Sequence, residues 1–281
     1  MRRTKPETSP RSAVDGGLHQ SVARIDLVMG VLAANAEHGV RLMDVCRETG
    51  LSKTAAHRLL HGLAAYRLAD FDERSSRYFV GYKIFGWASG AGNRFGLLRM
   101  AGPSLARLAD RFGDAVYLLV RNGDEAVCVE LVAGAFPIKT LALRVGDRRP
   151  LGIGAGALAM LSALSDPVVE RILKDGAKNR ASFAISDLDL RSLIRKTRSQ
   201  GYALVDGAVI RGIATLGLPL LLDDGAPIAA ISLSTTQDRL RPPRRQEIAD
   251  AIRAEIAGIS REFELGLTAS NAAALVRSSV G

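Results

Sequence analysis

The chain has 281 residues, 47% of them apolar, which is enough for two domains with packed cores. Its formal charge is +9, and residues 1–100 hold 15 Lys and Arg against 9 Asp and Glu. This concentration favours a nucleic-acid partner for the N-terminal part, although an arginine-rich proteome would also yield a basic chain. Two cysteines and four histidines without ligand spacing indicate no disulfide framework and no metal site, and we expect no cofactor.

The N-terminal region predicts a tail and then a helix. Residues 1–20 combine Pro, Ser, Gly and charge with few large apolar side chains, which predicts a disordered tail. Apolar residues then repeat with helical period over residues 21–35. No apolar run approaches the roughly 18 residues that span a bilayer. The basic start also lacks the apolar region of a secretory signal, so we expect a cytoplasmic protein with no membrane partner.

Residues 42–71 predict two helices joined by a tight turn, followed by the first strand of a hairpin. Gly50 ends the first helix, because glycine tolerates the positive φ that a helix C-terminus usually requires. The hydroxyl of Ser52 can cap the second helix, whose apolar face carries Ala56, Leu60 and Leu63. This pattern is typical of a helix-turn-helix.

The outer face of the second helix carries polar and cationic groups. At about 100° per residue, Thr54, Arg58 and His61 point away from the apolar face, with His57 on its shoulder. Such groups suit phosphate oxygens and base edges in a major groove. The alternative is a three-helix bundle with a solvated charged face.

A hairpin with basic residues near its tip follows. Residues 68–71 and 77–80 are strand-like, and the charged loop 72–76 separates them. We interpret this hairpin as the wing of a winged helix that binds double-stranded DNA. The expected DNA-binding residues are Ser52, Lys53, Thr54, His57, Arg58, His61, Arg74 and Arg77.

The domain boundaries follow from composition. We expect a disordered tail at 1–20, a winged helix-turn-helix domain at 21–83, and a glycine-interrupted linker helix or hinge at 84–97. A second domain at 98–268 and a flexible C-terminus at 269–281 complete the chain. Trp87 in the linker and the surface of the first helix are the expected contacts between copies in a homodimer or homotetramer.

The second domain reads as α+β with an antiparallel sheet. Asn122-Gly123 between two strand-like runs is a strong hairpin signal. The predicted strands cover residues 115–121, 126–132, 138–143, 202–205, 213–222 and 228–234. The predicted helices cover residues 97–112, 155–164, 168–174, 188–200 and 244–265.

One motif favours an enzyme instead. Residues 152–157, Gly-Ile-Gly-Ala-Gly-Ala, satisfy the G-x-G-x-x-A pattern of a dinucleotide site. That pattern should directly follow a buried strand, whereas Gly-Asp-Arg-Arg-Pro precedes it here. All four histidines lie in the N-terminal domain, and Cys128 in a predicted strand is expected to be a packed thiol, so no catalytic set emerges. An enzyme with an accessory basic domain, and a winged helix used only for protein contacts, remain as alternatives.

With both halves considered, the sequence resembles the IclR family of bacterial transcriptional regulators. The resemblance covers about residues 21–265. The segments that carry it are 49–54, 57–60, 77–81, 145–151, 201–203 with Gly212, and 229–234. It implies regulators that bind operator DNA as dimers or tetramers and respond to a small effector, often a carboxylate. Carried over position by position, the effector residues fall on Gly154, Ala155, Gly156, Ala157, Asp206, Thr215, Ser232 and Ser234.

The sequence departs from the family pattern at several positions. Ala55 stands where a threonine is common, Ala208 where an acidic residue is frequent, and Thr215 where a cysteine is frequent. Gly152 and Leu158 replace a frequent histidine and lysine. The loss of the histidine and the lysine at these two positions predicts a larger or less charged ligand than a two-carbon acid.

Three hydroxyl groups are expected to meet at this site. Ser232 and Ser234 alternate along one strand, so both point to the same face. Thr215 lies on the preceding strand, which a turn at 223–225 would pair with it. The alternative is that these hydroxyls bond to their own sheet.

Overall fold

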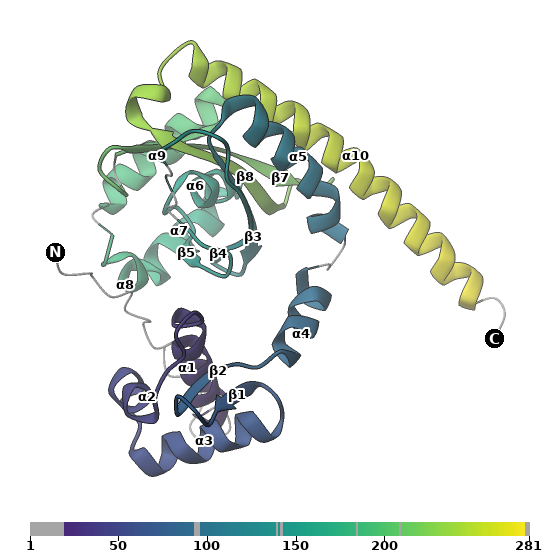
Figure 1. Cartoon of the computed structure of the whole chain (residues 1–281). Coiled ribbons are helices and arrows are strands. Elements are labelled where there is room, and N and C mark those ends of the chain that lie inside the picture. Colours follow the sequence, from purple (N-terminus) through teal and green to yellow (C-terminus); the bar gives the residue numbers. More distant parts are fainter. Residues whose placement is uncertain are drawn as a thin grey trace. The chain divides into compact units, whose positions relative to one another are not determined.

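The computed structural model describes residues 20–92, 96–138, 140, 143–183, 185–207 and 209–278 (Figure 1). Apart from Gln20, the predicted tail therefore lies outside the described residues. The chain divides into two compact units between Ala91 and Gly92.

The N-terminal unit is a winged helix-turn-helix, as predicted. Helices α1 (Gln20–Ala34), α2 (Leu42–Thr49) and α3 (Lys53–Ala65) precede a hairpin of β1 (Ala69–Asp72) and β2 (Arg77–Val80). The two strands pair antiparallel from Ala69 opposite Val80 to Asp72 opposite Arg77. The core of this unit contains Val28, Leu32, Val40, Val45, Ala56, Leu60, Leu63, Ala69 and Tyr78.

The turn between α2 and α3 forms through the two residues that predicted it. Gly50 adopts φ 72°, and its N–H donates to the Cys46 carbonyl. The Ser52 hydroxyl accepts a hydrogen bond from the Ala55 N–H at 3.3 Å. Both ends of the turn are thus fixed by local chemistry.

Helices α4 (Lys83–Gly92) and α5 (Leu97–Phe112) follow the wing, and α5 has the predicted limits. The C-terminal unit is built on a six-stranded antiparallel sheet, in the order β5-β4-β3-β8-β7-β6. The strands are β3 (Ala115–Asn122), β4 (Glu125–Val132), β5 (Arg148–Pro150), β6 (Ala203–Asp206), β7 (Ile213–Leu221) and β8 (Pro227–Thr236).

Helices cover both faces of this sheet, since side chains alternate along each strand. Helices α5 and α10 (Arg244–Ser278) form one core with Leu118, Leu216 and Leu233. On the other face, α6 (Ala155–Ser162), α7 (Asp166–Asp175) and α9 (Asp187–Gln200) form a second core with Tyr117 and Ala230. The short helices α8 (Ala177–Arg180) and η2 (Gln237–Arg239) lie in connections.

A buried carboxylate joins the start of β3 to the second half of the domain. Asp114 is 3% exposed. It accepts hydrogen bonds from Thr235 at 2.7 Å, Arg244 at 2.7 Å and Arg239 at 3.2 Å. These partners compensate for the burial of its charge.

The predicted elements of this domain need three corrections. A strand at 138–143 was wrong for its described residues, since Ile138, Thr140 and Leu143 lie in no strand and the rest lie outside the described residues. The strand that pairs with β4 is β5, which the sequence did not predict. Helix α10 also continues past the predicted end at residue 265, to Ser278, and so overlaps the expected flexible C-terminus.

Candidate DNA-binding surface and ligand cavity

Helix α3 separates its apolar and polar residues cleanly. Ala56 and Leu60 are fully buried against α1 and α2, which fixes the orientation of the helix. The opposite face is exposed and carries Lys53, Thr54, His57, Arg58 and His61.

These exposed groups are available to a partner. Within the described residues, neither Lys53 nor Arg58 makes an ion pair or side-chain hydrogen bond. The rings of His57 and His61 stack at 6.3 Å between centroids. Ser52 is exposed too, but its hydroxyl already caps the helix. A rigid helix with two cations and short polar groups is suited to a major groove.

The two wing arginines have different environments. Arg74 is exposed at the tip, where Asp72 accepts hydrogen bonds from the Arg74 N–H and the Ser75 hydroxyl. The Ser75 hydroxyl, and then the Arg74 N–H, lower the pKa of Asp72. Arg77 donates instead to the carbonyls of Gly39 at 2.9 Å and His38 at 3.1 Å.

The expectation that Arg77 is free to reach outward is therefore wrong. Its guanidinium ties β2 to the loop between α1 and α2. Asp72, its cross-strand neighbour, accepts hydrogen bonds from the Arg74 N–H and the Ser75 hydroxyl instead. Only Arg74 of the two keeps an outward position.

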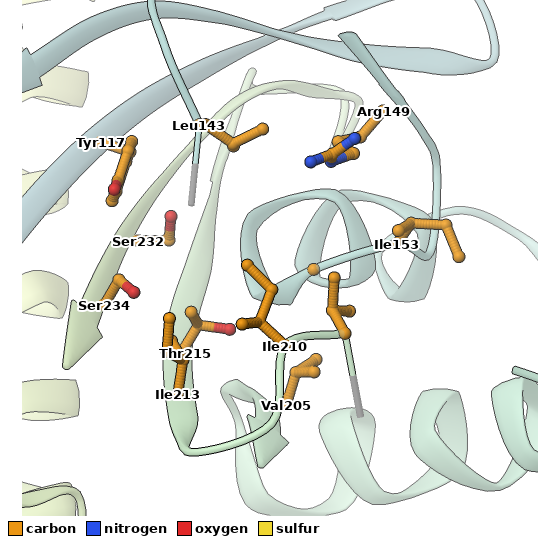
Figure 2. Close-up of a pocket in the computed structure, with 12 residues that line it drawn as sticks. Tyr117, Leu143, Arg149, Ile153, Val205, Ile210, Ile213, Thr215, Ser232 and Ser234 are labelled. Carbon is orange, nitrogen blue, oxygen red and sulfur yellow. The ribbon is translucent and has the colours of Figure 1, made fainter. Parts of the chain in front are cut away.

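The C-terminal unit contains a cavity on the sheet face that α6 covers (Figure 2). It holds about 510 Å³ of empty space, part of it open to solvent. Its lining residues are Tyr117, Leu143, Arg149, Ile153, Gly154, Val205, Val209, Ile210, Ile213, Thr215, Ser232 and Ser234.

The three predicted hydroxyl residues line this cavity together. Thr215 of β7 lies directly opposite Ser234 of β8, and Ser232 lies opposite Gly217. The side-chain oxygens of Thr215 and Ser234 are buried and have no hydrogen-bond partner among the described residues. For these two, the alternative that they bond to their own sheet is not met. An unpartnered buried hydroxyl costs about 1–3 kcal/mol, so a polar ligand here would be stabilised.

Arg149 is a lining residue that the sequence did not single out. Its guanidinium lies 5.3 Å from the ring of Phe183. Burial lowers the pKa of Arg149, and the negative charge of Asp147 acts in the opposite direction. Arginine nevertheless stays protonated in proteins. The cavity thus has a fixed positive charge, hidden in the sequence within the hydrophilic run at 146–150.

The glycine-rich segment contributes differently from the prediction. Gly154 lines the cavity, whereas Ala155, Gly156 and Ala157 are packed on the sheet. A Cβ on Gly217 would lie 2.9 Å from the backbone of Ala155 and Gly156. Glycine at 217 therefore lets the first turn of α6 approach β7 closely.

Asp206 does not reach the cavity. It is exposed and accepts a hydrogen bond from the Gln237 amide at 2.7 Å. Its neighbour Val205 lines the cavity, and alternation along β6 turns Asp206 the other way. The expected role of Asp206 in effector binding is therefore not supported by its position.

The described residues give little to the enzyme alternative. A dinucleotide fold requires parallel strands, but β5 before the glycine motif pairs antiparallel with β4. No group of three or more His, Cys, Asp or Glu that could hold a metal ion is found in the described part of the chain. Among the described helices, none is long and apolar enough to cross a membrane.

An exposed cationic recognition helix with a wing, together with a separate sheet domain that encloses a cavity, defines a ligand-responsive DNA-binding protein. Comparison with known families identifies which one. The family description "Bacterial transcriptional regulator IclR C-terminal" matches residues 91–261, and "IclR helix-turn-helix domain" matches residues 21–73. The chain belongs to the IclR family of bacterial transcriptional regulators, which confirms the resemblance seen in the sequence.

Individual relatives are distant but match over most of their length. The chain is 26% identical over 224 residues to the HTH-type transcriptional regulator KipR of Bacillus subtilis (strain 168), covering 79% of this chain and 89% of KipR. It is 26% identical over 230 residues to the HTH-type transcriptional repressor AllR of Klebsiella pneumoniae, covering 79% and 82%.

A solved structure has the same fold. An IclR homolog from Microbacterium hydrocarbonoxydans, complexed with 4-hydroxybenzoate, superposes with a TM-score of 0.72 at 19% identity. The match covers 88% of this chain and 100% of that chain.

Proposed function

We propose that this regulator binds operator DNA through α3 and the wing, and that a small organic acid in the C-terminal cavity changes this binding. The observation that supports this most is the cavity, where Arg149 and two buried hydroxyls without a partner among the described residues face the same space. The relative complexed with 4-hydroxybenzoate supports an aromatic acid as one ligand class.

The DNA contacts we propose differ in kind. Thr54, His57, Arg58 and His61 would face the major groove, with Lys53 and the Ser52 backbone near phosphates. Arg74 would contact the sugar-phosphate backbone from the wing. Arg77 would act by holding the wing in place.

The protein would work by binding and not by catalysis, in the cytoplasm where its operator lies. It would act as a homodimer or homotetramer, because one winged helix reads few base pairs and symmetric pairing multiplies affinity and specificity.

A fluorescence-anisotropy titration on the promoter of its own or the adjacent gene tests the proposal. Arg58→Ala should cost about 1–3 kcal/mol of operator binding if the guanidinium meets a base. Lys53→Ala should weaken all DNA sequences alike and reduce the salt slope by about one unit. Wild-type operator affinity in a folded Arg58→Ala variant would show that Arg58 does not contact a base.

The effector half is tested in the same assay with a screen of small carboxylates and aromatic acids. At least one acid should shift the operator affinity of the wild-type protein. If none does, regulation through this cavity by such acids has to be abandoned.

A further inference from the structure

We propose, building on the function above, that the cavity takes a monocarboxylate with an apolar body and a hydrogen-bonding group at its far end. Arg149 would hold the carboxylate, and the Thr215–Ser234 pair would hold the far group. This assigns both the class of ligand and its direction in the cavity.

The charge of the lining sets the number of carboxylates. Among the described lining residues, Arg149 carries the only full charge. Its partly buried guanidinium, which lies over the Phe183 ring, is a low-dielectric site for an anion. A second carboxylate would be buried without a cation, which is strongly unfavourable. The lining therefore selects a monoanion over a dianion of similar size.

The walls between the two polar ends are apolar. Leu143, Ile153, Val205, Ile210 and Ile213 supply them. Figure 2 shows Arg149 on one side of the cavity, with Thr215 and Ser234 away from it on the other. A ligand that spans this distance needs a hydrocarbon or aromatic body between its polar groups.

The side of the cavity away from Arg149 carries the hydroxyls of Thr215 and Ser234. Thr215 and Ser234 are direct cross-strand partners, so their Cβ atoms are about 4.5–5.5 Å apart. Each hydroxyl can donate one hydrogen bond and accept others. A single ligand hydroxyl can therefore donate to one of them and accept from the other.

Neighbouring polar groups leave this pair open. The Tyr117 hydroxyl donates to the Thr140 carbonyl at 2.9 Å, and the Thr140 hydroxyl donates to the Ser234 carbonyl at 2.8 Å. The backbone of Ser234 is thus used, whereas its side-chain oxygen has no partner among the described residues. The same holds for the side-chain oxygen of Thr215.

Calorimetric titration of the full-length protein with four probes that share a benzene ring tests the proposal. The probes are 4-hydroxybenzoate, benzoate, 4-hydroxybenzyl alcohol and terephthalate. We expect 4-hydroxybenzoate to bind tightest. Benzoate should bind about tenfold weaker for loss of the far hydrogen bonds, and the uncharged alcohol weaker by about tenfold or more. Terephthalate, a dianion, should bind more weakly than 4-hydroxybenzoate.

Two variants test which residues bind each end of the ligand. Thr215→Val combined with Ser234→Ala should erase the preference for 4-hydroxybenzoate over benzoate, while both acids still bind. Arg149→Met should erase the preference for the acid over the alcohol. Ser162→Ala removes a buried hydroxyl outside this cavity that has no partner among the described residues, and Arg144→Met removes an exposed arginine of the segment before β5. Both controls should keep the wild-type order of affinities, and thermal unfolding checks that each variant folds.

Three results would overturn the proposal. These are a preference that survives its matched variant, tightest binding of terephthalate, or no binding of any probe at millimolar concentration. The proposed function fails separately: probes could bind in the expected order without altering operator affinity. Conversely, an acid that alters operator affinity equally in the wild-type protein and in Arg149→Met would contradict only the proposed role of Arg149 and leave the proposed function standing.

Discussion

Some arginine side chains in this protein stabilise the fold and others remain available to a partner, and their hydrogen bonds distinguish the two groups. Arg244 neutralises the buried Asp114, whereas Arg77 donates to two backbone carbonyls. Arg58 and Arg74 are exposed and make no side-chain ion pair within the described residues. An arginine that is already hydrogen bonded stabilises the fold, and one that is not remains available to a phosphate or a base.

The two wing arginines should therefore separate stability from DNA binding. Arg77→Ala should lower the free energy of unfolding of the N-terminal unit by about 1–2 kcal/mol, because two carbonyls lose a charged donor. Arg74→Glu should change stability by less than about 0.5 kcal/mol, as surface changes usually do. It should weaken DNA binding at low salt. Urea unfolding and salt-dependent anisotropy measure both, and unchanged DNA affinity in Arg74→Glu would place the wing tip outside the interface.

The two cysteines should differ in reactivity. Burial, followed by the nearby charge of Asp147, raises the pKa of Cys128 to about 11. The reactive thiolate appears only as pH approaches that value, so at pH 8 its fraction is on the order of one in a thousand. Cys46 is only partly buried. Iodoacetamide at pH 8 should therefore modify Cys46 first, as read by peptide mass spectrometry.

Labelling of Cys128 should rise with pH and on unfolding. The sign follows from the raised pKa: the thiolate is favoured in the unfolded chain, so deprotonation above the unfolded value of about 8.5 reduces stability. Rapid modification of Cys128 in the native protein at neutral pH would contradict this environment.

Helices and strands with local signals were predictable from the sequence, and those fixed by distant contacts were not. The turn between α2 and α3 needed only Gly50 and Ser52, and both act as predicted. In the described part of the strand predicted at 138–143, Thr140 contacts the sheet through hydrogen bonds from the Tyr117 hydroxyl and from its own hydroxyl, and it lies in no strand. Strand β5 has only three residues, Arg-Arg-Pro, and carries no apolar alternation to reveal it.

The residues that line the cavity also divide into those that local sequence patterns predicted and those that distant contacts place there. Alternation along β8 and a hairpin to β7 were enough to bring Thr215, Ser232 and Ser234 to one face. Arg149 enters the cavity only because β5 pairs with β4, a contact that sequence periodicity does not report. Asp206 was misplaced by carrying over a family position without its strand alternation.

The close approach of α6 to β7 should depend on one residue. In Gly217→Ala, the new Cβ would lie 2.9 Å from the backbone of the α6 first turn, so the helix must move away from the sheet. We expect a loss of about 1–3 kcal/mol in stability, as for other overpacked cores. Binding of acids should weaken too, because Gly154 at the start of α6 lines the cavity.

Thermal unfolding and calorimetry measure both effects. Gly258→Ala is a matched control, since a Cβ at that helical position meets nothing within 4 Å. It should be neutral or slightly stabilising because alanine favours helix. A Gly217→Ala variant as stable as wild type would show that α6 tolerates a shift from the sheet.

The chain combines a DNA-reading unit with a ligand-holding unit, and regulation requires that the state of one alters the operator affinity of the other. The sequence identified both units because each has its own periodicity and its own motifs. It also predicted contacts between copies at Trp87 and the first helix, but a sequence does not show which apolar side chains are exposed. Exposed aromatic side chains give the structural indication.

The last part of the N-terminal unit carries such side chains. Tyr82, directly before α4, and Phe85 and Trp87 within α4 are 89%, 78% and 56% exposed. Clustered exposed aromatic groups are typical of interaction surfaces. We expect the wild-type protein to be a dimer or larger at micromolar concentration.

Phe85→Glu should then shift the protein toward a monomer and weaken operator binding by at least about tenfold, because a single winged helix loses the benefit of a second half-site. Leu188→Glu is the matched control: Leu188 is 74% exposed on α9 of the other unit, and the same change there should leave assembly intact. Light scattering gives the mass, and anisotropy gives the affinity on the same samples. A wild-type protein that is monomeric at micromolar concentration yet binds its operator with full affinity would rule out α4 as a dimerisation element, and symmetric pairing as the source of specificity.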